Sequence, residues 1–229
     1  MDSFAKAGVT LFEGHAQFLS SNRIQVGQEI LEASKIVIAT GAKPIRPNLP
    51  GIEHAIDSDG FWAIEEQPRK AIIVGGGYIA LELACALQGL GTQTTLLVRS
   101  QILREFDQEI AAHLETSLLK IGMQIHKGVT IQAIKKDPGG IQVTFLDHKE
   151  QLQEAQAEAI TLVATGREPN TGRLSLEKAG VELGDRGEIE VNQQDETTAA
   201  GIYAIGDVTL HPMLTPVAIK AGRILADRL

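Results

Sequence analysis

Three small residues stand at the spacing of a phosphate-binding turn in the stretch VGGGYIALE, residues 74–82. Gly75 and Gly77 are followed by Ala80, a G-x-G-x-x-A pattern that comes directly after the apolar run AIIV. The first Gly permits a tight turn, the second lets the backbone approach a pyrophosphate, and the small third residue lets a helix pack on its strand. The N-terminus of that helix adds free N–H groups that favour an anion. The stretch predicts a dinucleotide-binding turn.

Two arginines follow the next apolar run, in the stretch LLVRSQILR, residues 96–104. An acidic residue usually stands here, because a carboxylate accepts a hydrogen bond from a ribose 2′-hydroxyl. A 2′-phosphate would be repelled by that carboxylate and is bound well by guanidinium groups. Arg99 and Arg104 therefore predict NADPH rather than NADH as the cofactor. The alternative is that both are solvated loop charges that balance the neighbouring EFDQE segment.

An α/β unit must position these residues. The order of apolar runs and helical patterns predicts strands at 71–74, 94–98 and 123–126, alternating with helices at 78–91 and 107–122. This βαβαβ order is typical of a parallel sheet with crossover helices. Three further strand-like runs, with a DPGG turn after the first, predict a small antiparallel meander that leads back into the parallel sheet; they cover residues 129–136, 140–146 and 158–164.

Two similar phrases bracket this unit, VIATGAKP at 37–44 and LVATGREP at 162–169. In each, a strand-like run ends in Ala-Thr-Gly, and a proline follows after two more residues. Gly allows a sharp change of direction and Pro discourages a following helix. The phrases therefore predict the entry to and exit from an inserted domain. The flanks predict short strands over 9–40, 188–191 and 202–205, and a helix over 215–228.

The composition restricts the class of protein. The formal net charge of −8 argues against a nucleic-acid partner, and the absence of an apolar run of about 18 residues argues against a membrane span. The N-terminus lacks a signal-peptide pattern, and the only cysteine, Cys85, predicts a small core residue, so we expect a cytoplasmic protein. The histidines share no metal-ligand spacing, and we expect no metal site; they are His15, His54, His113, His126, His148 and His211.

With GGGYIALE, LLVRSQILREFD, VATGREPN, IYAIGDV and LTPVAIKAGR in this order, the sequence resembles the flavoprotein disulfide reductases and is most similar to the glutathione reductases. SDGFWAIEEQPRK and MLTPVAIKAGR favour that branch over the dihydrolipoamide dehydrogenases and mercuric reductases. The resemblance implies an α/β fold in which a Rossmann-like NADPH-binding domain, with its meander, is inserted in a partial FAD-binding domain. The implied boundaries are 1–40 for the first FAD segment, 41–168 for the NADPH domain and 169–229 for the returning FAD segment.

The resemblance also implies roles for residues at matched positions. Tyr78 would cover the flavin until nicotinamide displaces it, and Glu82 would help to place the hydride donor. Arg99 and Arg104 would clamp the 2′-phosphate, although their loop is one residue shorter than expected, so Arg104 would share it with Ser100 or reach it by another path. The implied NADPH site comprises Gly75, Gly77, Tyr78, Ile79, Ala80, Glu82, Arg99, Arg104, Gly166 and Arg167, and the implied FAD site Gly41, Asp207 and Thr215.

In such a reductase, electrons pass from NADPH to FAD, to a redox disulfide and to glutathione disulfide. The chain carries no second Gly-rich fingerprint before residue 70 and no cysteine pair, and the His211–Pro212 pair follows GDV, where the family's acid–base histidine is not expected. We therefore expect no catalytic residue in this chain, an incomplete FAD site, and NADP(H) binding without disulfide reduction. The implied partner is the remainder of a homodimeric reductase. Two alternatives stay open: a fragment of an NADH-dependent lipoamide- or mercury-type reductase, and a non-catalytic dinucleotide-binding module.

Overall fold

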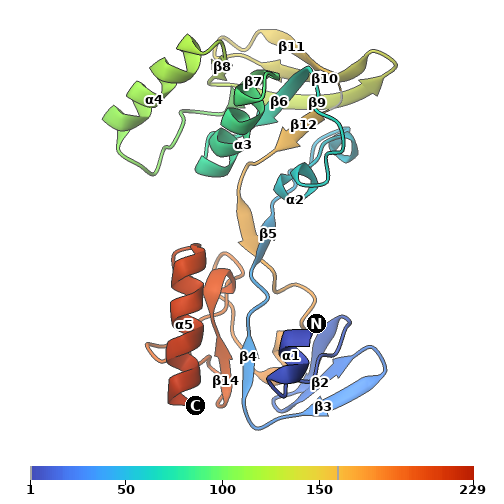
Figure 1. The fold of residues 1–229 in the computed structure, drawn as a ribbon, viewed down its shortest axis with the longest axis vertical. Helices are drawn as coiled ribbons and strands as arrows, with labels where there is room; N and C mark the ends of the chain where they lie inside the picture. The colour runs from blue at the N-terminus through green and yellow to red at the C-terminus, as the bar shows by residue number, and fades with distance from the viewer. Residues whose placement is uncertain (1, 159) are drawn as a thin grey trace. The chain divides into compact units, whose positions relative to one another are not determined.

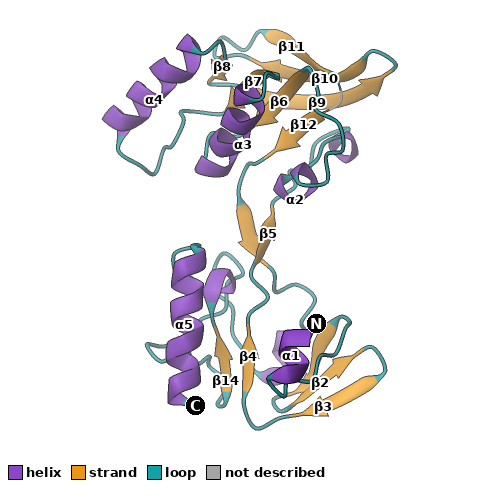
Figure 2. Cartoon of the chain, viewed as in Figure 1, coloured by secondary structure: helices purple, strands orange, loops and turns teal. Residues whose placement is uncertain are grey.

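The structure, a computed structural model, describes residues 2–158 and 160–229. The chain divides into two compact units. Unit 1 comprises Met1–Lys43 and Glu168–Leu229, and unit 2 comprises Pro44–Arg167. Figure 1 shows the course of the chain and Figure 2 the distribution of helices and strands. The elements of each unit follow from its own hydrophobic pattern.

Unit 2 is built on a four-stranded sheet in the order β12-β6-β7-β8, in which every neighbouring pair is parallel. Along the chain, β7 and then β8 are added to the sheet on one side of β6, and β12 is added last on the other side of β6. The strands are β6 (Lys70–Val74), β7 (Gln93–Val98), β8 (Gln124–Lys127) and β12 (Ile160–Val163). The helices are η1 (Ile52–His54), α2 (Ser58–Phe61), α3 (Tyr78–Gly89) and α4 (Gln108–Lys120).

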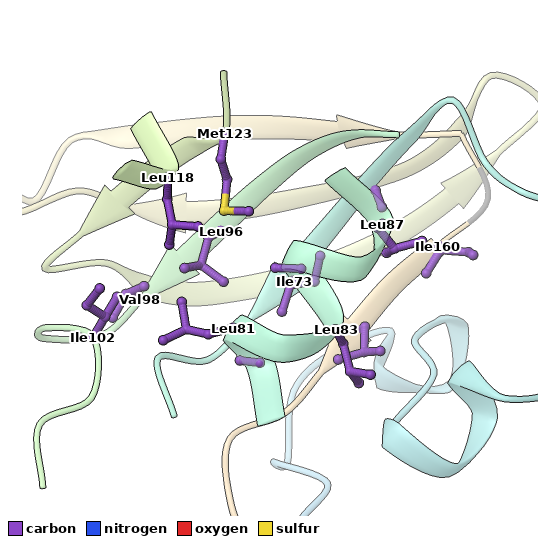
Figure 3. Packing of buried hydrophobic residues seen from close by; sticks show 14 of the residues in the cluster. Ile73, Leu81, Leu83, Leu87, Leu96, Val98, Ile102, Leu118, Met123 and Ile160 are labelled. Carbon is purple, nitrogen blue, oxygen red and sulfur yellow. The ribbon is translucent and has the colours of Figure 1, made fainter. Parts of the chain in front are cut away.

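The two faces of this sheet carry different partners. Because side chains alternate along a strand, Ile73 and Leu96 face a cluster that includes Leu81 of α3 and Leu118 of α4. Figure 3 shows these helix side chains packed over the strand residues. Ile72 points the opposite way, into a second cluster beneath the meander. Burial on both faces explains why β6 after Lys70 is apolar throughout and why all four side chains of β12 are buried, including that of Thr161.

The meander is antiparallel in the order β11-β10-β9, with β9 (Thr130–Asp137), β10 (Gly140–Leu146) and β11 (Leu152–Ala157). The sequence pattern predicts 158–164 as its third run, and this is wrong. The third strand is β11, and the run that follows it forms β12 of the parallel sheet. Sequence patterning misses β11 because LQEAQA is polar and mostly exposed, so it shows no apolar period.

Unit 1 contains an antiparallel β1-β2-β3 sheet and a parallel β4–β14 pair. The predicted strand at 188–191 is absent; Ile189 makes only an isolated bridge with Leu183. The strands are β1 (Ala16–Ser20), β2 (Arg23–Val26), β3 (Glu29–Glu32), β4 (Ile36–Ile38) and β14 (Ile202–Ala204). The helices are α1 (Asp2–Lys6), η2 (Leu176–Ala179), η3 (Gly206–Val208) and α5 (Thr215–Arg228).

The two similar phrases found in the sequence pair with each other. β5 (Ala42–Pro44) and β13 (Arg167–Pro169) form a two-stranded ribbon where the chain passes from one unit to the other. The amide of Asn170 donates to the carbonyl of Gly41 at 2.9 Å, and the amide of Ile45 donates to that of Gly166 at 3.0 Å. Each glycine thus accepts from the residue four positions beyond the other, which makes the crossing reciprocal.

An ion pair also joins the two phrases. Lys43 and Glu168 occupy equivalent positions in the two phrases, and their Nζ and Oε1 atoms lie 3.2 Å apart. Because both side chains are about half exposed, the pair adds little stability. Across residues 2–158 and 160–229, no helix has the length and apolar character needed to cross a membrane.

Thr161 in β12 offers a test of the packing in unit 2. Its hydroxyl is fully buried and has no hydrogen-bond partner among the described residues. Since valine has nearly the same shape without the unpaired polar atom, Thr161→Val should raise the free energy of unfolding by about 1 kcal/mol in urea denaturation.

Thr94→Val is the matched control, because the equally buried Thr94 hydroxyl donates to the carbonyl of Thr92 at 3.2 Å. That change should not stabilise the protein. Equal stabilisation by both substitutions would contradict the burial argument.

Candidate functional site

The turn after β6 has the backbone geometry that a close approach requires. Gly75 has φ +143°, and a Cβ there would overlap the carbonyl oxygen of Ala164, which follows β12. The same Cβ would lie 3.3 Å from that of Ala80, so the small third residue of the motif is also needed for packing. Gly77 has no atom within 4 Å of the position of its missing Cβ. The missing side chain at Gly75 therefore allows the close contact with Ala164, and the missing side chain at Gly77 leaves open space beside the backbone.

The helix that follows presents an unneutralised N-terminus. Gly77 is the N-cap of α3, with no side-chain hydrogen bond to the free amides and no acidic residue in the first turn. By contrast, Asp107 caps α4, accepting from the amides of Glu109 and Ile110 at 2.9 and 3.1 Å. The first amides of α3 and the positive end of its dipole thus remain available to an anion. These free amides, with the open space beside Gly77, are features that binding of a diphosphate requires.

The remaining predicted residues of α3 divide between core and surface. Ala80 is fully buried and Ile79 packs against the same cluster. Tyr78 is 41% exposed, and Glu82 is exposed one turn further along the helix. Cys85 is half-buried, and burial, with a smaller contribution from Glu82, raises the pKa of its thiol. Only Tyr78 and Glu82 of this set can therefore reach a bound molecule with their side chains.

The two predicted clamp arginines lie in different environments. Arg99 is the first residue after β7; it is exposed, and its side chain makes no hydrogen bond or ion pair with any residue that the structure describes. Arg104 is paired with its neighbour Glu105, with Nε and Nη2 at 3.0 and 2.8 Å from Oε1. The positive charge of Arg99, at the carboxyl edge of the sheet, is thus available to a ligand, whereas that of Arg104 is neutralised by Glu105.

The loop that carries these arginines is attached to the glycine turn. The amide of Leu103 donates to the carbonyl of Gly76 at 2.7 Å, and Ile102 is buried in the core. A Cβ at Gly76 would lie 2.6 Å from Cγ1 of Val98 and 3.0 Å from the carbonyl oxygen of Gln101. The middle glycine of the triplet, which the motif leaves free, is therefore required by this packing. Sequence reasoning missed it; the run of three glycines was the available signal.

Gly166 and Arg167 follow β12 at the same edge. The amide of Ala164 donates to the carbonyl of Val74 at 2.8 Å, which brings the ends of β12 and β6 together. Gly166 has φ +146°, and Arg167 donates from Nη1 to the hydroxyl of Ser58 at 3.5 Å. The predicted residues of unit 2 thus lie at the carboxyl ends of β6, β7 and β12, where the strand order reverses. Open α/β sheets bind ligands at such switch points.

Asp57 anchors the segment that contacts Arg167. Its Oδ1 caps α2 by accepting from the amides of Asp59 and Gly60, and its Oδ2 lies 3.3 Å from Nε of Arg46. The pKa of this carboxyl lies below its usual value, mainly because of the hydrogen bond from the Gly60 amide; burial opposes this, and the charge of Arg46 lowers the pKa further. The cap fixes the backbone at Ser58, whose hydroxyl accepts from Arg167.

The three predicted FAD residues belong to unit 1. Gly41, with φ +66°, begins the crossing ribbon, and Asp207 is part-buried in η3. Thr215 is the exposed first residue of α5, which has no side-chain cap. Gly206, with φ +74°, lies against α5: a Cβ at this position would be at contact distance, 3.4 Å, from that of Ala218. Asp207 and the open end of α5 are therefore neighbours in unit 1.

Two histidines of unit 1 each contact one protein group. His211 Nε2 lies 3.2 Å from Oδ1 of the buried Asp195, and His15 Nε2 lies 2.8 Å from the carbonyl oxygen of Arg173. In the part of the chain that the structure describes, no three His, Cys, Asp or Glu side chains converge as metal ligands would. These contacts give the two histidines structural roles within their unit.

Comparison with known proteins places this geometry in a family. Residues 2–222 match the family described as pyridine nucleotide-disulphide oxidoreductase. The chain belongs to that family. Three proteins named glutathione reductase are similar: that of Nostoc sp. is 38% identical over 97% of this chain, that of Burkholderia cepacia 41% over 96%, and that of Yarrowia lipolytica 42% over 88%. The matched region is 50%, 48% and 43% of those relatives, so the chain spans about half their length.

Solved structures give the same result. The HOCl-induced flavoprotein disulfide reductase RclA from Escherichia coli superposes with a TM-score of 0.89 at 30% identity, covering 96% of this chain and 51% of that one. Its Cu(II) complex superposes with a TM-score of 0.86 at 31% identity, covering 94% and 49%. The mixed α/β fold of this oxidoreductase family, predicted from the sequence, is confirmed. The family description names a pyridine nucleotide, and both structures are described as flavoproteins.

The glycine geometry predicts separable effects of two similar substitutions. Gly77→Ala meets no atom of the protein, so it should lower the free energy of unfolding by no more than about 1 kcal/mol. Its methyl group would fill the space that a pyrophosphate needs, so we expect dinucleotide affinity to fall about tenfold or more in calorimetric titration.

Gly75→Ala should instead destabilise the fold by more than about 2 kcal/mol, because it combines a strained φ with overlap on the Ala164 carbonyl. Thermal melts distinguish the two variants. Unchanged dinucleotide affinity in a folded Gly77→Ala variant would rule out this turn as the pyrophosphate site.

Proposed function

We propose that unit 2 is the NADPH-binding domain of a flavin-dependent disulfide reductase, and that the substrate of the longer protein is glutathione disulfide. One observation carries the nucleotide part of the proposal: the unpartnered Arg99 lies on a loop that is hydrogen-bonded to the glycine turn at the uncapped end of α3. A diphosphate and a 2′-phosphate on one dinucleotide would need these two features close together. An arginine that was only a solvated surface charge would need neither the bond between its loop and the glycine turn nor the uncapped end of α3 nearby.

The residues of unit 2 suggest how a bound NADPH is held. The amides at Gly77 and in the first turn of α3 would donate to the diphosphate, and Arg99 would bind the 2′-phosphate. Gly166 and Arg167, after β12, would line the other side of the switch point. Tyr78 and Glu82, the exposed residues of α3, would face the nicotinamide end and orient it. The bound nucleotide would supply a hydride, and the protein would supply position and charge.

The flavin part of the proposal rests on unit 1. Asp207 would accept hydrogen bonds from ribityl or phosphate-adjacent hydroxyls, and Thr215 would lie against the isoalloxazine ring at the open end of α5. Gly41 would allow the backbone to approach the same cofactor. We propose that these residues form only part of an FAD site, since the matched relatives are about twice as long as this chain.

The substrate assignment has a different support. Three relatives with 38–42% identity are named glutathione reductase, and the similarity extends over 88–97% of this chain. We propose the same substrate for the protein to which this chain corresponds, with the redox disulfide and acid–base histidine outside these residues, homodimeric assembly and a cytoplasmic location. An NADH-dependent lipoamide- or mercury-type reductase is the competing assignment, and the two arginines after β7 disfavour it.

Arg99→Ala tests the nucleotide assignment directly. Removing one charged hydrogen-bonding partner of the 2′-phosphate should weaken NADPH binding about tenfold or more and leave NADH affinity within about twofold. Fluorescence or calorimetric titration of the purified chain with each nucleotide measures both. Arg23→Ala, at an exposed position in unit 1, is the control and should change neither affinity. A preserved NADPH preference in Arg99→Ala would show that this residue is not the phosphate anchor.

The extent of the catalytic machinery is tested by turnover. The purified 229-residue chain should bind NADPH but should not oxidise it when glutathione disulfide is added, even with free FAD present. A redox disulfide requires two cysteines, and this chain has only Cys85. Absorbance at 340 nm follows NADPH directly. Enzymatic consumption of NADPH that depends on glutathione disulfide would overturn the proposed division of function.

A further inference from the structure

The arginine loop carries a negative charge that the cofactor assignment leaves unused. Glu105 presents a single carboxylate oxygen to both Nε and Nη2 of Arg104, at 3.0 and 2.8 Å. Arg104 is 58% exposed and Glu105 76% exposed. An ion pair this open to solvent is weak and is readily replaced by a stronger anion. Arg104 is therefore occupied by its neighbour, whereas Arg99, five residues earlier, is not.

The backbone around this pair is fixed. The side-chain amide of Gln108 donates to the carbonyl oxygens of Leu103, Arg104 and Phe106, at 2.9, 3.3 and 2.8 Å. On the other side, the amide of Leu103 donates to Gly76. Adjustment at this place thus falls to the side chains of Arg104 and Glu105. Rotation of the guanidinium from Glu105 to another anion requires no rearrangement of the loop.

The nearby carboxylates differ from Glu105 in this respect. Asp107 holds the N-terminus of α4 through two backbone amides, so its Oδ1 is already committed. Glu109 lies in the first turn of α4, where a negative charge is favoured by the helix dipole. Among the described residues of this loop and the start of α4, Glu105 is the carboxylate that pairs with a predicted phosphate ligand.

We propose that Glu105 is a specificity-determining residue that competes with the 2′-phosphate of NADPH for Arg104. This inference rests on the proposed NADPH site. Binding of a 2′-phosphorylated nucleotide would break the Arg104–Glu105 pair, and the cost of breaking it would reduce affinity for that nucleotide. A nucleotide without the phosphate leaves the pair intact and bears no such cost. Glu105 thus narrows the preference for NADPH that Arg99 establishes.

Glu105→Gln tests this competition, because glutamine keeps the size of the side chain and removes its charge. Calorimetric titration of the purified chain should show about two- to fivefold tighter binding of NADP⁺ and unchanged binding of NAD⁺. Adenosine 2′,5′-bisphosphate, which retains the 2′-phosphate without the nicotinamide, should show the same gain. Glu109→Gln is the matched control and should change neither affinity; thermal melts establish that each variant is folded.

A double-mutant cycle separates competition from simple repulsion between Glu105 and the ligand. If the residues compete, the gain from Glu105→Gln disappears in the Arg104→Ala background. A gain that persists without Arg104 would overturn the proposal in favour of direct repulsion. Unchanged NADP⁺ affinity in Glu105→Gln, with a wild type that prefers NADP⁺, would also overturn it and leave the proposed function intact. A wild type that does not prefer NADP⁺ would instead remove the proposed function on which this inference rests.

Discussion

The close approach between Gly75 and the carbonyl oxygen of Ala164 is the constraint on which the site in unit 2 depends. It brings the ends of β6 and β12 together without an intervening side chain. The chain must then leave β6 in a conformation that a residue with a Cβ rarely adopts, and this turn directs Gly77 and the first amides of α3 outward. Packing and anion binding thus follow from one backbone path. The small side chain of Ala80 serves the same approach from the helix side.

A local electrostatic pattern is built on that path. The whole chain has a formal net charge of −8, yet the start of α3 lacks acidic residues and the loop after β7 carries two arginines. The bond between Leu103 and Gly76 joins these two positive features, so their separation is set by backbone rather than by flexible side chains. Preorganised charge of this kind binds an anion with little ordering cost. Glu105, the carboxylate that pairs with Arg104, reduces this positive charge without cancelling it.

The sequence allowed the fold class and the parallel core of unit 2 to be predicted because both depend on local signals. The apolar run before the glycine triplet and the helical period after it mark β6 and α3, and the DPGG turn marks the start of β10. β11 was missed because its stability comes from pairing with β10 rather than from a buried face. Motif spacing could not identify the roles of Gly76, Glu105 and Gln108 either. Each of these residues acts through a contact in the loop after β7. The conformation of that loop depends on tertiary packing, which the spacing of residues in a motif does not reveal.

The reciprocal crossing of the two ATG phrases has a consequence for the order in which the chain can fold. Unit 2 is one continuous segment, whereas β4 and β14 of unit 1 are separated by all of it. The entropic cost of joining β4 to β14 is that of closing a very long loop while unit 2 is unfolded. Once unit 2 has folded, the bond between Ile45 and Gly166 holds its two ends together, so the loop that unit 1 must close no longer includes the length of unit 2. Folding of unit 2 should therefore lower the entropic cost of pairing β4 with β14 in unit 1.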